Sequence, residues 1–172
     1  RGFTAMSEKM KPKEVVTTLN AYFSEMIDII FKYDGTLDKI VGDELMVVFG
    51  APISREDDAD RAVKTAIGMV EALRKFNDSR LKKNKVPINA GIGINKGKVI
   101  SGNIGSKDQM DYTVIGDTVN LGARLCSFAG PLKIIISKSV KDEIGDEYKT
   151  RKLAPIEVKG KRKPVDIFKV LT

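Results

Sequence analysis

The chain has 172 residues, 42% of them hydrophobic and 31% charged, with a formal net charge of +7, which suits one globular domain with a hydrophobic core. It has no apolar run long enough for a membrane helix, and its one cysteine, Cys126, cannot form an internal disulfide, so we expect the reducing environment of the cytoplasm. Because the chain has no histidine, histidine-based triads, histidine proton shuttles and ordinary zinc sites are excluded, and any chemistry must use carboxylates, Lys, Arg, hydroxyls or a hard metal ion.

Hydrophobic periodicity and turn residues predict helices that alternate with strand hairpins. The expected elements in chain order are a helix over residues 13–31, a hairpin over 32–50, a long helix over about 55–84, a second hairpin over 88–106, a short helix near 117–129, a strand over 133–137 and a last pair of strands over 156–170. In the first hairpin Gly42-Asp43 forms the turn, and residues 47–49 are expected to be buried. Ser54 and Asp57 are expected to cap the long helix.

This order of elements predicts an α+β fold, a mostly antiparallel sheet with helices packed on it. It is the order of a ferredoxin-like βαββαβ core whose opening strand is missing from this chain. We expect that strand to precede Arg1, so residues 1–172 are expected to form one domain that is incomplete at its N-terminus.

Two glycine-rich stretches resemble phosphate-binding motifs but do not fit them. GIGINKG has one residue too many for G-x-G-x-x-G and leads into a strand instead of a helix. GINKGK has one residue too few between its glycines for a P-loop, and Val99 replaces the hydroxyl residue. We expect these glycines to relieve crowding on a strand face or to mark bulges.

Asp43 and the pair Asn120 and Arg124 are the clearest candidate site residues. A carboxylate on a tight hairpin at a sheet end suits Mg²⁺, although Asp beside Gly also favours a turn without any ligand. Asn120 and Arg124 are four residues apart and project from one helix face, where they form either a forked anion site or a solvent-exposed polar stripe. The neighbouring buried face is expected to contain Val119, Ala123 and Cys126.

Lys39, Thr113 and Lys159 carry weaker signals. Lys39 stands four residues before Asp43, and Thr113 stands seven before Asn120. Taken singly they are typical of a surface lysine and a strand threonine. Lys159, in the basic turn, is a candidate for holding a terminal phosphate or belongs to a solvated charge run.

Four motifs occur in a fixed order along the chain. They are RGFT at 1–4, LDKIVGDELMVVFGAP at 37–52, INAGIGINKGKVISGNIGS at 88–106 and DYTVIGDTVNLGARL at 111–125. Together they resemble the catalytic domain of class III nucleotidyl cyclases, the adenylate and guanylate cyclase homology domain. The resemblance covers nearly the whole chain and implies an adenylate cyclase that converts ATP to 3′,5′-cyclic AMP and pyrophosphate.

The resemblance implies a role for each candidate that faces the phosphates. Asp43 matches the second of two metal-binding aspartates, which together hold two Mg²⁺ or Mn²⁺ ions, and the first normally lies two residues before the position of Arg1. Phe3 and Thr4 match the segment whose backbone amides wrap the phosphates at a helix start. Lys159 matches the lysine that reaches the terminal phosphates.

The resemblance also implies how the nucleoside is held. Asn120 and Arg124 match the pair that steadies the ribose and the transition state. Lys39 and Thr113 match the base-reading positions, where Lys with Asp, Thr or Ser is typical of adenylate cyclases and Glu with Cys of guanylate cyclases, so Lys39 favours adenine. Active sites of this family form between two such domains, which implies a homodimer, and we expect a regulatory domain upstream.

Other functions stay open at this stage. The chain could be a guanylate cyclase or have relaxed base choice, or it could be a catalytically silent cyclase-like domain that binds nucleotide or a regulatory partner. VGDEL is similar to the diguanylate cyclase motif Gly-Gly-Asp-Glu-Phe, from which Val41 and Leu45 depart. The positive charge allows a nucleic-acid binder, but aromatic residues are few and not interleaved with basic ones, so we expect no nucleic-acid partner and no membrane insertion by this segment.

Overall fold

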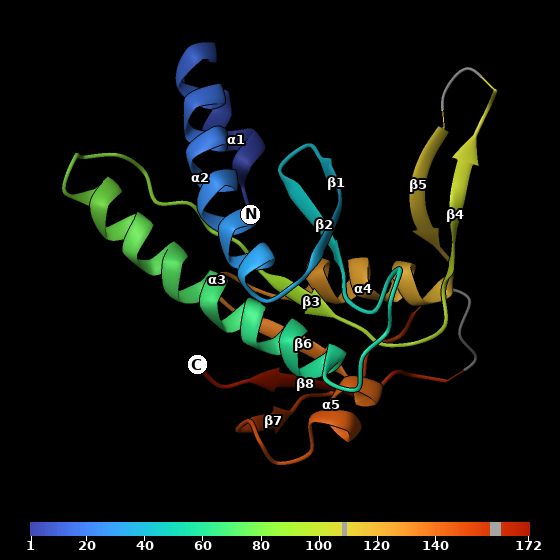
Figure 1. The fold of residues 1–172 in the computed structure, drawn as a ribbon. Coiled ribbons are helices and arrows are strands. Elements are labelled where there is room, and N and C mark those ends of the chain that lie inside the picture. Colours follow the sequence, from blue (N-terminus) through green and yellow to red (C-terminus); the bar gives the residue numbers. More distant parts are fainter. Residues whose placement is uncertain (108–109, 159–162) are drawn as a thin grey trace.

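A computed structural model describes residues 1–107, 110–158 and 163–172 (Figure 1). The helices and strands are α1 (Phe3–Ser7), α2 (Pro12–Lys32), β1 (Thr36–Val41), β2 (Glu44–Val48), α3 (Asp58–Leu81), β3 (Ile92–Ile94), β4 (Ile100–Gly105), β5 (Met110–Ile115), α4 (Asp117–Phe128), β6 (Ile134–Ser137), α5 (Lys138–Ile144), β7 (Thr150–Lys152) and β8 (Ile167–Val170). The predicted helices over 13–31, 55–84 and 117–129 are confirmed, while α1, α5 and β7 were not predicted.

The central sheet is covered by helices on both faces. Its strands lie in the order β3-β6-β8-β7, with β3 and β6 parallel and the other neighbours antiparallel. Ile134 and Ile136 of β6 pack against α3 and α5, whereas Ile135 between them packs against α4. Because successive strand residues point to opposite faces, this isoleucine run is buried on both sides. The mixed α+β fold with helices packed on largely antiparallel strands is confirmed.

The predicted hairpin over residues 88–106 is wrong. Its first half, β3, pairs in parallel with β6, and its second half, β4, pairs antiparallel with β5. Ile92 and Ile94 of β3 pack into the core beside α3, whereas β4 is mostly exposed. The turn residues between β3 and β4 alone would predict that these strands pair with each other. Because β3 is packed into the core and β4 is exposed, they pair with different strands. The last two strands also differ from the prediction, since β8 pairs with β7 and β6, and residues 156 and 165 form only an isolated bridge.

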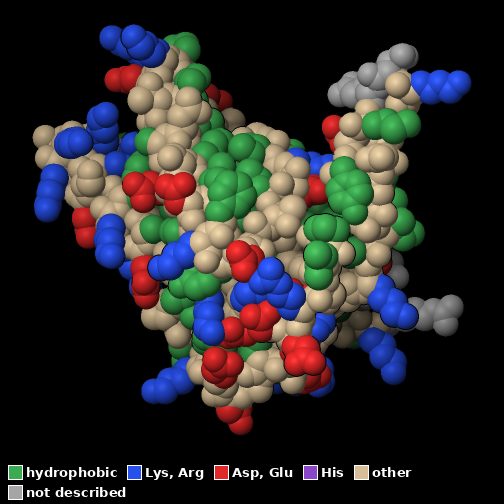
Figure 2. Space-filling view, in the orientation of Figure 1, with side chains coloured by type: hydrophobic (Ala, Val, Ile, Leu, Met, Phe, Trp, Pro, Cys, Tyr) green, Lys and Arg blue, Asp and Glu red, His purple; other side chains and the backbone are tan. Residues whose placement is uncertain are grey.

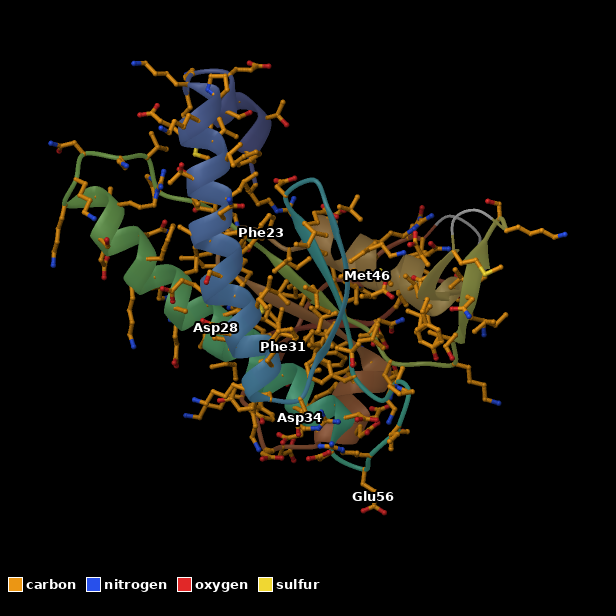
Figure 3. The ribbon with its side chains drawn as sticks, turned by 45° about the horizontal axis from the view of Figure 1, so that its top comes forward. Phe23, Asp28, Phe31, Asp34, Met46 and Glu56 are labelled. Atoms are coloured by element: carbon orange, nitrogen blue, oxygen red, sulfur yellow. The ribbon has the colours of Figure 1, made fainter. Side chains whose placement is uncertain are left out.

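The hairpin of β1 and β2 pairs only within itself, beside α2 (Figure 1). Gly42-Asp43 forms its turn, as predicted. Residues 47–49 are only half-buried, so their predicted burial is wrong; an isolated two-stranded hairpin shields little of its own surface. Phe23 of α2 and Leu45 of β2 pack on the same core cluster, and Figure 3 shows Phe23 on the side of α2 that faces the hairpin.

Arg61 joins the start of α3 to the start of the first hairpin. Its buried guanidinium donates hydrogen bonds of 3.0 Å to the carbonyl oxygens of both Tyr33 and Asp34, at the end of α2. Asp58 accepts from the Ser54 hydroxyl at 3.0 Å and also pairs with Arg61. The predicted capping pair of Ser54 with Asp57 is therefore wrong by one residue.

Two glycines allow α4 to lie directly on β3. A Cβ atom at Gly93 would stand 2.6 Å from the carbonyl carbon of Leu125 and 2.7 Å from the carbonyl oxygen of Gly122, and one at Gly91 would stand 2.5 Å from the Ala129 oxygen. These are backbone atoms that cannot rotate away. The prediction that the glycines relieve crowding on a strand face is confirmed.

Within the described residues, no helix combines the length and the apolar character that crossing a membrane requires.

Gly93→Ala is expected to destabilise the fold strongly, because the new methyl group would collide with the α4 backbone. Overpacking of this kind costs on the order of 1–3 kcal/mol, or more where backbone must move. The free energy of unfolding is measured by urea titration. The matched control is Gly102→Ala in β4, where nothing lies within 4 Å of the new atom, and the expected change is within about 0.5 kcal/mol. Equal stability of the two variants would contradict this account.

Candidate active site

Asp43 is presented at the tip of the β1–β2 hairpin. Val41 and Glu44 close the ladder, which leaves Gly42 and Asp43 as a two-residue turn. Gly42 has a φ of 61°, and a positive φ at the first turn position is the geometry that makes glycine favourable in type II′ hairpins. The Asp43 side chain is exposed and is therefore accessible to a ligand.

A cavity of about 270 Å³ lies beside this turn. It is lined by Asp43, by Phe3 at the start of α1 and by Tyr22 of α2, among other residues. Burial, followed by the nearby Cys126 and Asp43, raises the pKa of Tyr22 to about 12. The Tyr22 hydroxyl therefore keeps its proton at neutral pH. Phe3 and Asp43 thus line one cavity, whereas Thr4 belongs to α1 but is not among the described lining residues, and a shared role of the three stays a prediction.

Arg1 connects this cavity to the end of α4. It lines the cavity, and its guanidinium donates hydrogen bonds to the carbonyl oxygens of Cys126 and Ser127, the latter at 2.6 Å. These carbonyls belong to the last turn of α4, where the Cys126 oxygen also accepts a hydrogen bond of 3.2 Å from the Ala129 amide. The position of α4 is thereby tied to the wall of the Asp43 cavity.

Asn120 and Arg124 lie on the exposed face of α4, one turn apart, as predicted. The buried stripe of this helix is Leu121 and Leu125, continued by Ala129. The predicted buried face of Val119, Ala123 and Cys126 is wrong: Ala123 is exposed and the other two are only half-buried. The direction of the stripe is set by the contact with β6 and β8, which the local pattern does not reveal.

Lys39 and Thr113 come together through a third residue, Asp38. The Thr113 hydroxyl donates a hydrogen bond of 2.9 Å to Asp38 Oδ2, and Lys39 Nζ lies 3.5 Å from the same oxygen. Thr113 is 7% exposed and the Asp38 side chain 6%, whereas Lys39 is 37% exposed. The two predicted base-reading residues thus lie at one place, on strands of two different hairpins.

The candidates therefore fall into three places on the chain. Asp43 and Phe3 line the same cavity. Lys39 and Thr113 both lie next to the Asp38 carboxylate. Asn120 and Arg124 project from α4 and are not among the described residues that line the Asp43 cavity. Lys159 lies outside the described residues.

The residues at the hairpin tip fit a metal ion that arrives with a phosphate ligand. In the described part of the chain, no three His, Cys, Asp or Glu side chains cluster closely enough to hold a metal. Asp43 and the adjacent Glu44 are both exposed carboxylates. Mg²⁺ is commonly bound by only one or two carboxylates together with substrate phosphates and water, and the donor set at this turn is of that kind.

The chain matches known proteins over almost all of its length. It matches the family described as the adenylate and guanylate cyclase catalytic domain over residues 1–171. It is 36% identical to an adenylate cyclase of Anabaena cylindrica over 179 residues, which is 99% of this chain and 35% of that protein. It is similar in structure to the guanylyl cyclase Cya2, with 42% identity, a TM-score of 0.90 and coverage of 99% and 86% of the two chains. It is similar also to the adenylyl cyclase CyaB from P. aeruginosa, with 37% identity, a TM-score of 0.96 and coverage of 100% and 89%.

Fold and motifs together define a nucleotidyl cyclase domain of class III. The chain belongs to the adenylate and guanylate cyclase catalytic domain family. It spans about a third or less of the length of the relatives it matches.

Sequence reasoning missed Asp38 and Tyr22. Asp38 is the extra residue of a β-bulge, since Leu37 pairs with Val47 and Lys39 with Met46, and no residue of β2 faces Asp38. Bulges have no reliable sequence signature, although an acidic residue within an apolar strand is a signal that could have drawn attention to Asp38. Tyr22 is a buried residue of α2, and nothing in the sequence pattern assigned it a place beside Asp43.

Cys126, two residues after Arg124, is expected to be a slow nucleophile. Burial, followed by the Glu44 carboxylate, raises the pKa of the Cys126 thiol, and its Sγ donates to the Gly91 carbonyl oxygen at 3.4 Å. Because the thiolate is the reactive form, the folded chain has less of it at pH 8 than the unfolded chain. Iodoacetamide should modify the native protein more than about tenfold more slowly than the urea-unfolded protein. Since Cys126 is the only cysteine, the reaction is followed by mass; equal rates in the two states would contradict the expectation.

Proposed function

We propose that this domain is an adenylate cyclase that converts ATP to 3′,5′-cyclic AMP and pyrophosphate at sites shared between two copies of the chain. The observation that carries the proposal is the separation of the candidate residues. Asp43 and Phe3 line one cavity, while Asn120 and Arg124 stand exposed on α4, away from its lining. A symmetric dimer brings the cavity of one copy to the α4 face of the other, and membership of the cyclase family supports this reading.

The reaction assigned here is an in-line displacement. The ribose 3′-oxygen attacks the α-phosphorus, a new P–O bond closes the ring, the bond to the bridging oxygen breaks, and pyrophosphate leaves as the hydroxyl proton is released. When bound, two Mg²⁺ or Mn²⁺ ions per site would make the 3′-hydroxyl more acidic and would neutralise charge on the phosphates. Asp43 is the residue of this chain that would hold such ions.

The remaining residues bind and orient the nucleotide. Arg124 meets the charge that builds on the α-phosphate, since a guanidinium is permanently charged and forms bidentate contacts with phosphate. Asn120 orients the ribose from the preceding helical turn. The amides of Phe3 and Thr4 contact the phosphates, and Lys159, outside the described residues, is assigned to the terminal phosphate on the resemblance alone.

The β4–β5 hairpin supports a homodimer. It pairs with no other strand in the described chain and stands away from the body of the molecule (Figure 1). Figure 2 shows hydrophobic side chains along it, and its exposed large hydrophobic residues are Ile100, Ile104, Met110, Tyr112 and Ile115. A lone two-stranded hairpin is marginally stable in water, and an exposed apolar surface of this kind marks an interaction site. We assign it to the contact with a second copy.

ATP is the proposed substrate because Lys39 stands beside Thr113 at the base-reading positions. GTP is the second candidate, and a specific observation favours it: the 42% identical structure is that of a guanylyl cyclase. Turnover of the two nucleotides under the same conditions separates them.

Because the chain covers about a third or less of the length of its relatives, we also propose an upstream regulatory domain. We further propose a cytoplasmic location, where ATP is available.

Arg124→Ala is expected to lower kcat for ATP by about 10²–10³-fold, the loss typical when one donor to a developing oxyanion is removed. Cyclic AMP formation is measured with Mn²⁺ and with Mg²⁺ on a chain extended upstream of Arg1, where the resemblance places the first metal aspartate. The matched control is Arg151→Ala, an exposed arginine on β7, which should leave kcat unchanged. Product from GTP and none from ATP would contradict the proposed substrate.

Mixing two inactive variants tests the shared site directly. In a heterodimer of Asp43→Ala and Arg124→Ala, one site keeps both groups and the other loses both. Random pairing then restores about a quarter of the unsubstituted activity. A mixture of Asp43→Ala with Asp43→Asn forms no intact site and is the control. Absence of rescue, with heterodimers demonstrated by differential tagging, would exclude the shared-site arrangement.

A further inference from the structure

We propose that Asp38 sets the purine preference of this domain by fixing the Thr113 hydroxyl as a hydrogen-bond acceptor. The inference rests on the proposed function, because it concerns the base-reading positions of that site. Asp38 is inferred to act through Thr113 as a positioning residue, without touching the substrate itself.

The geometry around Asp38 is local and well defined. Asp38 is the bulged residue of β1, with no partner on β2. A bulge redirects a side chain away from the regular alternation of the strand. The carboxylate reaches the other hairpin, where Oδ2 accepts the Thr113 hydrogen bond at 2.9 Å. It links the two strands that carry the base-reading residues.

This hydrogen bond uses the only hydrogen of the hydroxyl. A threonine hydroxyl has one donor and two acceptor lone pairs, and it normally rotates to suit its partner. A carboxylate can only accept, so Thr113 must donate to it. Because Thr113 and the Asp38 side chain are both more than 90% buried, water competes poorly for this donor. Only lone pairs remain for a ligand.

Adenine and guanine differ at the atoms that such a group would meet. Adenine carries an N6 amino donor where guanine carries an O6 acceptor. A hydroxyl that can only accept a hydrogen bond pairs with the amino group of adenine. With guanine, the same hydroxyl faces the O6 oxygen, which is also an acceptor, and no hydrogen bond forms. An unpaired buried polar group is costly, and sites that reject a substrate in this way discriminate strongly.

Neither base-reading residue alone makes this choice. The Lys39 ammonium has three donors and can serve the N1 acceptor of adenine or the O6 acceptor of guanine. A free threonine hydroxyl can serve either base. Lys39 lies 3.5 Å from the same Asp38 oxygen and remains 37% exposed, so it can still donate to a base. The discriminating element is therefore the direction of the Thr113 hydrogen bond.

The test compares Asp38→Ala and Asp38→Asn with the unsubstituted protein, on a chain extended upstream of Arg1. The measured quantity is the ratio of kcat/KM for ATP to that for GTP. In Asp38→Ala the hydroxyl can turn and donate to guanine O6, so the ratio is expected to fall about tenfold, the size of one hydrogen bond. In Asp38→Asn the amide oxygen is expected to face the two donors, Lys39 and Thr113, so the ratio should stay within about twofold. Asp38→Leu, which keeps the branching at Cγ in a larger side chain without an acceptor, should behave like Asp38→Ala, and thermal unfolding identifies any variant that does not fold.

Thr113→Val shows whether the effect passes through the hydroxyl. Adding Asp38→Ala to Thr113→Val should leave the nucleotide ratio unchanged, because the group that Asp38 orients is already absent. If Asp38→Ala slows both nucleotides equally, Asp38 only holds the two strands together and the inference is overturned. A further fall of the ratio in the double variant would overturn it as well, since Asp38 would then act through another group such as Lys39.

A binding measurement separates this inference from the proposed function. The dissociation constants of ATP and GTP are obtained by competition with a fluorescent ATP analogue for the same variants. Absence of turnover would contradict the proposed function, while the ratio of the two constants would still test Asp38. Tighter binding of GTP than ATP by the unsubstituted protein would overturn the role of Asp38 together with the assignment of adenine.

Discussion

The contact between α4 and β3 is the constraint on which the candidate site depends. Gly91 and Gly93 have no Cβ, so the backbone of α4 lies against the strand at a distance that any side chain would prevent. With one face held in this way, the opposite face presents Asn120 and Arg124 to solvent. The last carbonyls of the same helix accept hydrogen bonds from Arg1, which lines the Asp43 cavity. One close packing contact therefore positions groups that serve different parts of the proposed reaction.

The distribution of polar groups is the reason for proposing a second copy. Asp43, the proposed metal ligand, lines a cavity whose described lining does not include Arg124, the proposed transition-state cation, so in the proposed reaction the two groups act on one phosphate only if they come from different copies. Among the described residues, the Asn120–Arg124 face of α4 is exposed, and the β4–β5 hairpin, whose Thr113 is buried against Asp38, pairs with no further strand and exposes most of β4 (Figure 1). In a symmetric dimer the same two surfaces are used twice, so a single interface completes two sites. In the proposed dimer, the exposed apolar residues of the hairpin would supply buried contact area and the polar residues of α4 would supply the chemistry.

Local sequence signals predicted the helices and the Gly42-Asp43 turn, because periodicity and turn chemistry are properties of neighbouring residues. They failed for β3, whose parallel partner β6 lies about 40 residues further along the chain and is selected by burial of Ile92 and Ile94. They also failed for the buried stripe of α4, which is set by contact with the sheet. Most candidate site residues came from ordered motifs, but Asp38 did not, because its position depends on a bulge that only strand pairing reveals.

Overall similarity cannot decide between adenine and guanine, since this chain is about as similar to a guanylyl cyclase structure as to an adenylyl cyclase structure. The two bases differ at the relevant edge by the direction of hydrogen bonds, not by size. A residue that recognises this difference need only be held with its proton pointing one way. A buried carboxylate is suited to that task because both of its oxygens only accept hydrogen bonds, whereas a hydroxyl in its place could also donate. In the proposed scheme, selection of the base depends on Asp38, a side chain that acts behind the recognition surface through Thr113.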